Sequence, residues 1–361
     1  MTMTSRQRVE AALRHEQPDR TPVFEYVLLP PLADQLLGRP FCAIDWESLR
    51  TADEWEKAVR RLAVDQLDLA CRLGHDMMYV LWSPPPPSKA SPAAAPAATA
   101  DDPVEALKRR NEAAAKAPAG PSQECFRVYS ILKQEMARRG ADLPILAPTY
   151  MPGVWTDVDL MQTMVLAPEV AHEHFAQATR RAMYLIEIFI ELGIEMIGVG
   201  GDFAGTRLLI SPEAYRRFIV PEVRKCSQRV HRAGRWAINA SDGDLWPVIE
   251  DFLLGCEVDG YLEIDMHAGM DMRKLKAAYG GRVTLMGNLD CGNILSFGTP
   301  QKVRQHVIDC LEAGMGHGGH ILCASNAITS SVPMKNYLAV IDAYRDFFSL
   351  PRFKPGGRCG P

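Results

Sequence analysis

The chain has 361 residues, of which 47% are hydrophobic and 23% are charged, a composition typical of a globular chain with a sizeable core. The formal net charge is −4, with acids and bases mixed along the chain, so no basic stripe is present that would bind nucleic acid. Residues 1–20 lack the apolar stretch of a signal peptide, and no apolar run is long enough to span a bilayer. We therefore expect a cytoplasmic protein that contacts neither nucleic acid nor membrane.

One pattern repeats along the chain, in which a short apolar strand, a turn with polar or glycine residues and an amphipathic helix follow one another. This pattern predicts parallel strands joined by crossover helices. The candidate strands are residues 21–25, 77–81, 145–149, 196–200, 236–238, 260–263, 283–286 and 321–323. Eight strands are the number in a (β/α)8 TIM barrel, so we predict an α/β fold with one barrel domain over residues 1–361.

Residues 83–121 do not fit this pattern. They contain four consecutive prolines, an Ala/Pro-rich tract and then a helix-compatible stretch over 103–116. The segment follows the second candidate strand and would project from the face where barrel enzymes do chemistry. A lid or partner-docking arm is one interpretation, but the composition favours a surface insertion with little apolar surface to bury.

Polar side chains follow most of the candidate strands at the point where each strand ends. The carboxyl ends of barrel strands surround the active-site mouth, so we expect these side chains to meet there. They are Glu25, Tyr26, Asp202, Asn239, Ser241, Asp242, Glu263, Asp265, Asn288, Asp290, Ser325 and Asn326. Crowded carboxylates raise the pKa of at least one member, which supplies a general acid, or they bind a hard cation. A helix cap or a solvated loop residue is the alternative for each acid taken alone.

Several segments resemble the uroporphyrinogen decarboxylase superfamily in their order and spacing. They read RQRVEAALRHEQPDRTPV (6–23), GGDFAGTRLLISPEAYRRFIVP (200–221), ASDGDLWPVIE (240–250), LEIDMHAGMDMRKLK (262–276), GNLD (287–290) and VPMKNYLAVIDA (332–343). The resemblance implies a (β/α)8 barrel with its site in the mouth, which agrees with the strand count.

The resemblance leaves the activity open, because the superfamily includes porphyrinogen decarboxylases, zinc-dependent thiol methyltransferases and corrinoid-dependent demethylases. The decarboxylases carry an arginine-rich segment after the first strand, where this chain has Phe24, Glu25 and Tyr26 followed by residues 27–31. An acidic, apolar mouth suits a polycarboxylate poorly. We therefore rank decarboxylation of a tetrapyrrole acid second.

The zinc branch binds its metal through a His-x-Cys pair after strand five and a cysteine after strand eight. This chain has Ala240, Asp242 and Asn326 at those positions, so we expect no zinc. Asp242 with Asp202 or Glu263 would suit a harder ion, but hydrogen bonding to substrate or loop backbone is the interpretation we favour, and we predict no metal.

The resemblance therefore favours a corrinoid (cobalamin)-dependent methyltransferase that removes the methyl group of a small methoxylated compound. Asp202, Asp242 or Glu263 would protonate the departing oxygen. The predicted substrate-binding residues are Glu25, Tyr26, Asn239, Ser241, His267, Asn288, Asp290 and Asn326.

The corrinoid is expected on a separate protein. A corrinoid module would show Asp-x-His-x-x-Gly followed by another domain, whereas the chain has Asp265-Met-His267-Ala-Gly269-Met270 without either the final glycine or that domain. A catalytically silent barrel that serves as a binding subunit is a third hypothesis. The assembly state is not fixed by the sequence, and a homodimer is one alternative.

Overall fold

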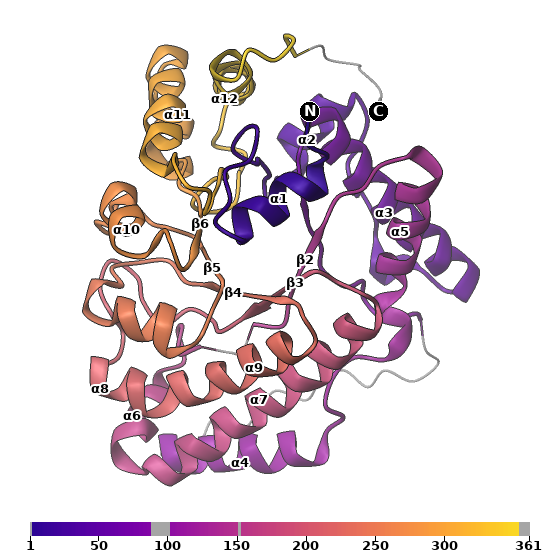
Figure 1. Ribbon diagram of the computed structural model, residues 1–361. Coiled ribbons are helices and arrows are strands. Elements are labelled where there is room, and N and C mark those ends of the chain that lie inside the picture. Colours follow the sequence, from indigo (N-terminus) through magenta and orange to yellow (C-terminus); the bar gives the residue numbers. More distant parts are fainter. Residues whose placement is uncertain (1, 88–101, 151–152, 354–361) are drawn as a thin grey trace.

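The computed structural model describes residues 2–87, 102–150 and 153–353. Its centre is a parallel sheet of seven strands in the order β1 to β7, curled into a half-barrel with helices around it (Figure 1). The strands are β1 (Met78–Tyr79), β2 (Ile145–Pro148), β3 (Met196–Val199), β4 (Trp236–Ala240), β5 (Gly260–Leu262), β6 (Thr284–Met286) and β7 (His320–Ile321). Each strand pairs with the next one along the chain, as a repeated strand–helix unit requires.

Residues 21–25, predicted as the first of eight strands, form only an isolated parallel bridge between Val23 and Leu322. The Phe24 N–H donates to Leu322 O at 3.1 Å on one side, and the Asp76 N–H donates to Val23 O at 2.8 Å on the other. Pro22 has no N–H, and the Val23 N–H donates to the Asp76 carboxylate at 3.1 Å, so the backbone ladder is too short for a strand. The described sheet thus has seven strands, and this segment lies between its two edges.

The helices begin and end at local sequence signals. Thr51 accepts from the Glu54 N–H and Glu54 bonds back in a capping box, and the helix it opens ends at Gly74 with φ +74°. Ser211 accepts from the Ala214 N–H, as its position before Pro212 predicts. The α-helices are α1 (Ser5–Leu13), α2 (Pro30–Leu37), α3 (Ala52–Leu73), α4 (Pro103–Lys116), α5 (Arg127–Arg139), α6 (Val158–Leu166), α7 (Pro168–Glu191), α8 (Pro212–Ala214), α9 (Val220–Arg232), α10 (Met272–Tyr279), α11 (Pro300–Gly314) and α12 (Met334–Phe347). Short 3-10 or π turns are η1 (Trp46–Ser48), η2 (Gln123–Phe126), η3 (Tyr215–Ile219), η4 (Trp246–Val248), η5 (Asp251–Gly255) and η6 (Cys291–Leu295).

Helix α1 covers the amino-terminal end of the sheet (Figure 1). Val9 and Leu13 pack with side chains from inside the half-barrel, such as Leu146 and Met286. The Ala12 carbonyl accepts from the Thr284 hydroxyl at 3.1 Å and from the Gly319 N–H at 2.9 Å. With this end filled, the carboxyl ends of the strands remain for the site.

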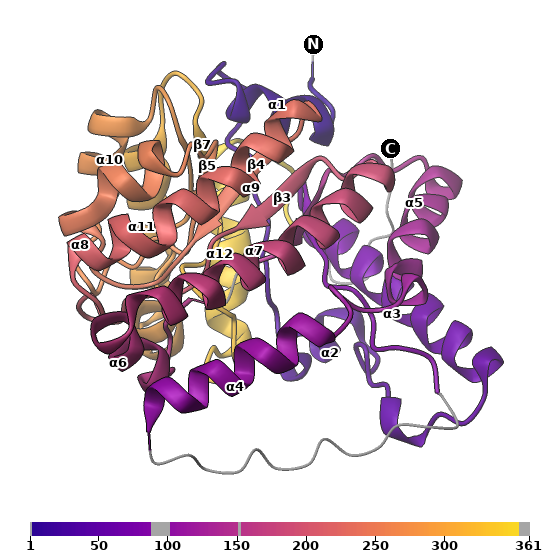
Figure 2. The ribbon, with the colours of Figure 1, turned by 90° about the horizontal axis from the view of Figure 1, so that it is seen from below.

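The described part of the insertion is packed on the outside of the fold. Figure 2 shows α4 beside α7, and Leu107 of α4 is fully buried. The buried Asn111 amide donates to Val170 O at 2.9 Å, and Arg110 pairs with Asp157 at 2.8 Å. Residues 88–101, the other part of the predicted insertion, lie outside the described residues.

Among the helices that are described, none is both long and apolar enough to cross a bilayer.

Candidate active site

A cavity of about 350 Å³ lies where the strands β1 to β5 end. The polar side chains in its wall are Tyr79, Tyr150, Asp202 and Glu263, and Trp155 forms part of its edge. No arginine or lysine is found among the described residues that line it. The cavity therefore combines acids and aromatic rings without a cation to neutralise them.

The three predicted catalytic acids, Asp202, Asp242 and Glu263, are brought together here. The Asp242 N–H donates to Asp202 Oδ1 at 3.4 Å, which joins the loops after β3 and β4. Burial, followed by the negative charges of Asp242 and Asp202, raises the pKa of Glu263 to about 8. Burial, followed by Asp202 and Asp265, raises the pKa of Asp242 to about 7. At neutral pH at least Glu263 is largely protonated and can donate a proton.

Glu263 is held by its backbone and by Tyr26. Its φ is +72°, a left-handed conformation that residues other than glycine rarely adopt. The Tyr26 hydroxyl forms a hydrogen bond with the Glu263 side chain, and burial together with the nearby Glu263 raises the Tyr26 pKa. The Tyr26 ring stands edge-on to Tyr79, with the ring centroids 5.6 Å apart. These contacts fix the carboxyl group beside two neutral phenols.

Asn326 and Ser241 orient the aspartates. Asn326, from the loop after β7, donates its amide to Asp242 Oδ2 at 2.7 Å. Ser241 forms a side-chain hydrogen bond with Asp202, and this bond, like the Asp242 N–H, opposes the effect of burial, which raises the Asp202 pKa. Residues after three different strands thus converge on one acidic group.

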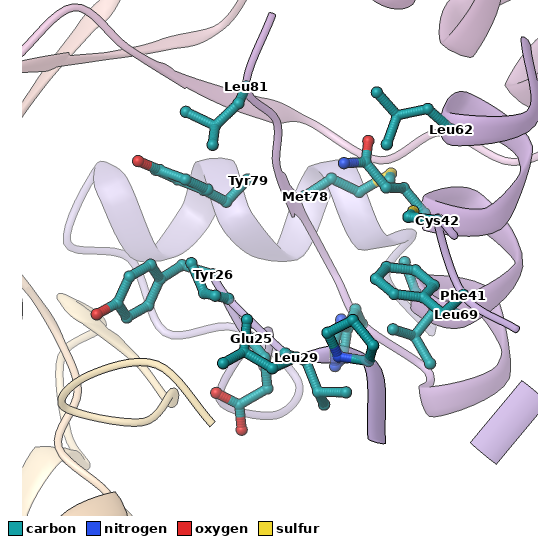
Figure 3. Close-up of a pocket in the computed structure, with 16 residues that line it drawn as sticks. Glu25, Tyr26, Leu29, Phe41, Cys42, Leu62, Leu69, Met78, Tyr79 and Leu81 are labelled. Atoms are coloured by element: carbon teal, nitrogen blue, oxygen red, sulfur yellow. The ribbon is translucent and has the colours of Figure 1, made fainter. Parts of the chain in front are cut away.

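Glu25 lies beside this group but has other partners. Its Oε2 accepts from the Ala324 N–H at 3.1 Å, and Tyr337 forms a hydrogen bond with its side chain. Burial raises the Glu25 pKa to about 8. Figure 3 shows the Glu25 carboxyl group and the Tyr26 hydroxyl pointing to different sides.

The structure does not bring Asn239 or Asn288 into the mouth. Asn239 is 1% exposed, and its amide donates to Phe252 O at 3.3 Å while its oxygen accepts from the Ala240 N–H at 3.0 Å. Asn288 is buried and lines a separate cavity between α10 and α11, where the Cys310 thiol contacts its Oδ1 at 3.6 Å. Strand-end position alone did not distinguish these buried amides from mouth residues, and their substrate-binding role remains a prediction.

His267 and Asp290 form a pair of their own. Asp290 is 1% exposed, caps η6 by accepting from the Asn293 N–H at 2.9 Å, and contacts His267 Nε2 at 2.7 Å. The His267 side chain is half exposed. Asp290 therefore acts as a buried cap that also holds an exposed imidazole, and neither residue lines the acidic cavity as the structure describes it.

Three aromatic residues of this cavity were missed by the sequence reasoning. Tyr79, Tyr150 and Trp155 all follow or end a strand, but Tyr26 was the only aromatic side chain considered at strand ends. The Tyr150 hydroxyl is buried without a hydrogen-bond partner. A Cβ on Gly198 would lie 2.7 Å from the Tyr150 ring, so this glycine is what lets the ring lie over β3. A glycine within a predicted strand was the available signal.

No group of three or more His, Cys, Asp or Glu side chains within the described ranges has the arrangement of a metal site. Ala240, Asp242 and Asn326 stand close to the mouth as the alignment of motifs implied, but none offers a thiolate or imidazole. The prediction that the protein uses no zinc stays a prediction.

By its fold and site, the protein is of the α/β class, with parallel strands and an acidic site at their carboxyl ends. The sequence model of the uroporphyrinogen decarboxylase (URO-D) family matches residues 141–347, more than half of the chain, and the chain belongs to this family.

Curated relatives are similar over a part of their length. A uroporphyrinogen decarboxylase of Coxiella burnetii is 26% identical over 194 residues, covering 52% of this chain and 50% of the relative. One of Psychromonas ingrahamii is 26% identical over 191 residues, covering 51% and 50%. The chain thus spans about half the length of the curated relatives it matches.

A solved structure is similar over nearly the whole chain. The structure described as a methyltransferase from Methanosarcina mazei superposes with a TM-score of 0.68, at 18% identity, covering 96% of this chain and 99% of that one. At this identity the likeness shows a shared fold.

Proposed function

We propose that the protein is a corrinoid-dependent methyltransferase that demethylates a small methyl ether. The observation that carries this proposal is Glu263, a partly buried acid with a pKa of about 8 in a cavity without cationic side chains among its described lining residues. Such an acid is suited to protonating an oxygen that leaves with a negative charge. The methyltransferase that shares the fold supports the same choice.

The proposed step breaks the bond between the methyl carbon and the ether oxygen. The corrinoid, a second substrate delivered by a separate protein, would supply the electron pair for the new bond to the methyl carbon. The oxygen keeps the bonding pair and takes the proton of Glu263. Tyr26 holds the Glu263 carboxyl group through their hydrogen bond, and the neighbouring Asp202 and Asp242 keep its pKa high.

The edge of the cavity suits the docking of a large partner. Trp155 is 52% exposed, and the loop after β3 carries Leu209, which is 40% exposed. A Cβ on Gly205, in the same loop, would lie 3.6 Å from the Trp155 ring, so this loop lies beside Trp155. Exposed apolar side chains around a functional site are typical of interaction surfaces.

Decarboxylation of a porphyrinogen is the second candidate, since the family match and the curated relatives carry that name. A substrate with many carboxylates requires cationic partners, and the described lining of the acidic cavity offers none. A silent barrel is the third candidate, but buried acids with raised pKa values are costly to keep without a use.

An anaerobic assay separates the three candidates. Purified protein is mixed with Co(I) cobalamin and a panel of methoxylated aromatics and methylamines, and the absorbance change that accompanies cobalamin methylation is followed. We expect methylation that depends on both protein and methyl ether and is lost with Glu263→Gln. Porphyrinogen turnover in a parallel assay, without cobalamin methylation, would replace this function by decarboxylation, and inactivity in both assays would favour the silent barrel.

We also propose that residues 22–24 complete an eight-stranded barrel in solution. Their hydrogen bonds to Leu322 on one side and to Asp76 on the other support this closure.

A further inference from the structure

A second cavity, of about 270 Å³, adjoins the acidic one, since Tyr79 lines both, and Figure 3 shows the residues of its wall. Its wall is built from the segment after residue 24, the residues after α2, one face of α3 and the region of β1. Leu29, Phe41, Leu62, Leu69, Met78 and Leu81 make most of this wall apolar. Leu29 and Leu81 are 38% and 50% exposed, so apolar side chains border the way in.

Tyr26 and Tyr79 connect the two cavities. Tyr79 lines both of them, and Tyr26 lines the second cavity while its hydroxyl bonds to Glu263 in the first. A molecule in the second cavity therefore lies against Tyr79 and against Tyr26, whose hydroxyl holds the proposed acid. This continuity makes it a candidate for the part of the substrate that does not react.

The size of this cavity limits its occupant. A cavity of roughly 150 Å³ is enough for benzene, so about 270 Å³ admits one substituted ring. A tetrapyrrole is several rings too large.

The cavity carries little charge at neutral pH. The described residues that line it include neither arginine nor lysine. Burial lowers the His75 pKa to about 3, which leaves the imidazole neutral, and burial raises the Glu25 pKa to about 8, which leaves that carboxyl group mostly protonated. An ionised ligand would lose its water there without gaining a counter-charge.

One polar side chain of the wall has an oxygen without a hydrogen-bond partner. Gln66 Oε1 is buried and accepts no hydrogen bond. Gln66 shares its face of α3 with Leu62 and Ala70, which also line the cavity, at the spacing of successive helical turns. A buried acceptor without a donor is costly, so a ligand hydroxyl that donates to it would be selected over the same ligand without one.

We propose that this cavity binds the ring of the substrate, an uncharged monocyclic aromatic methyl ether with a hydroxyl group that donates to Gln66, and that the ether end faces Tyr26 and Tyr79. This assignment of a substrate class rests on the proposed methyltransferase function. In this assignment Gln66 is a specificity residue. The second cavity, which is apolar and lies beside the reacting acids, excludes charged substrates.

Binding is measured first, by calorimetry at pH 7 without any corrinoid. The ligands are 2-methoxyphenol, methoxybenzene and 4-hydroxy-3-methoxybenzoate. We expect 2-methoxyphenol to bind about tenfold more tightly than methoxybenzene, and at least thirtyfold more tightly than the carboxylate. Equal or tighter binding of the carboxylate, or no binding of any of the three, overturns the assignment.

Two variants locate the binding. Gln66→Met replaces the amide with an apolar side chain of similar length and so removes the acceptor, and we expect it to abolish the tenfold preference for the phenol. Leu62→Trp fills the cavity and is expected to weaken 2-methoxyphenol binding by more than thirtyfold. Val64→Trp, at a half-buried position on the same helix that does not line the cavity, is the control, and circular dichroism verifies that each variant is folded. Unchanged affinity in both folded cavity variants contradicts the assignment.

A methyl-transfer assay on the same variants separates the two proposals. Selective binding that responds to Gln66→Met, with no cobalamin methylation from any donor, leaves the cavity assignment standing and removes the methyltransferase function. Methylation that is insensitive to both cavity variants keeps the function and removes the assignment.

Discussion

Partial burial and the neighbouring Asp242 and Asp202 raise the pKa of Glu263, so this side chain keeps its proton at neutral pH. If it donates that proton to the leaving oxygen, Glu263→Gln should lower the rate of methyl transfer by about 10² to 10⁴-fold. The affinity for the methyl ether should change little, since the amide keeps the shape of the side chain. Single-turnover rates and calorimetry measure the two quantities, with the exposed Glu112→Gln of α4 as the control.

The pH dependence of the rate follows from the same side chain. An acid catalyst must be protonated, so kcat should fall as pH rises through about 8, the pKa of Glu263. Asp202→Asn removes one of the negative charges that raise this pKa and should move the fall to lower pH. Asp53→Asn, whose side chain is 75% exposed on α3, should leave the profile unchanged. A profile that is flat to pH 9 would assign the proton transfer to another group.

The candidate site could be predicted from the sequence where a short polar residue ends a strand and its side chain reaches the mouth. This held for the grouping of Asp202, Asp242 and Asn326. It did not hold for Asn239, because the direction of a side chain at a strand end depends on the twist and register of the sheet. The partners of Asp290, a cap and an imidazole, were likewise set by tertiary contacts that no local pattern reveals.

At the scale of elements, Asp76 connects the covered end of the sheet to the residues that bridge its edges. It is fully buried and pairs with Arg8 and Arg20, each at 2.6 Å. Asp76→Asn would leave two largely buried guanidinium groups without this charge, so we expect a loss of about 3–5 kcal/mol in the free energy of unfolding.

The control for Asp76 is Asp142→Asn, because Asp142 pairs with Arg6 but its side chain is 57% exposed. An exposed pair contributes roughly 0–1 kcal/mol. Urea denaturation of both variants gives the comparison, and equal losses would mean that Asp76 does not anchor this end of the fold.

Seven of the eight predicted strands are present because each is an apolar run followed by a turn and an amphipathic helix. The exception, at residues 21–25, involves Pro22 and the Asp76 side chain, which take two backbone positions out of the ladder. Its apolar pattern could be read from the sequence, whereas the competition from a carboxylate 53 residues away could not.

Hydrogen exchange tests whether this segment closes the barrel. The Phe24 and Leu322 amides should be protected to the same degree as the Val80 amide, which donates to Leu146 O. Exchange of the first two at least 100-fold faster than that of Val80 would mean that the segment opens independently of the sheet.

At the scale of the whole molecule, the covered amino-terminal end of the sheet, the acidic cavity and the second, apolar cavity have different roles. The first stabilises the sheet; in the proposed function, the second would supply the proton and the third would select the substrate. If the proposal holds, one fold, shared with a methyltransferase and matched by a decarboxylase family, carries a site with its own chemistry.

The most direct test of the account follows the methyl group itself. 2-Methoxyphenol labelled with ¹³C in its methyl group is incubated anaerobically with the protein and Co(I) cobalamin, and the label is located by NMR. We predict that the label is recovered on cobalamin, with one unlabelled catechol released for each methyl group moved, and that Glu263→Gln slows this at least 100-fold. Label that stays on the ether while the protein turns over a porphyrinogen would contradict the account.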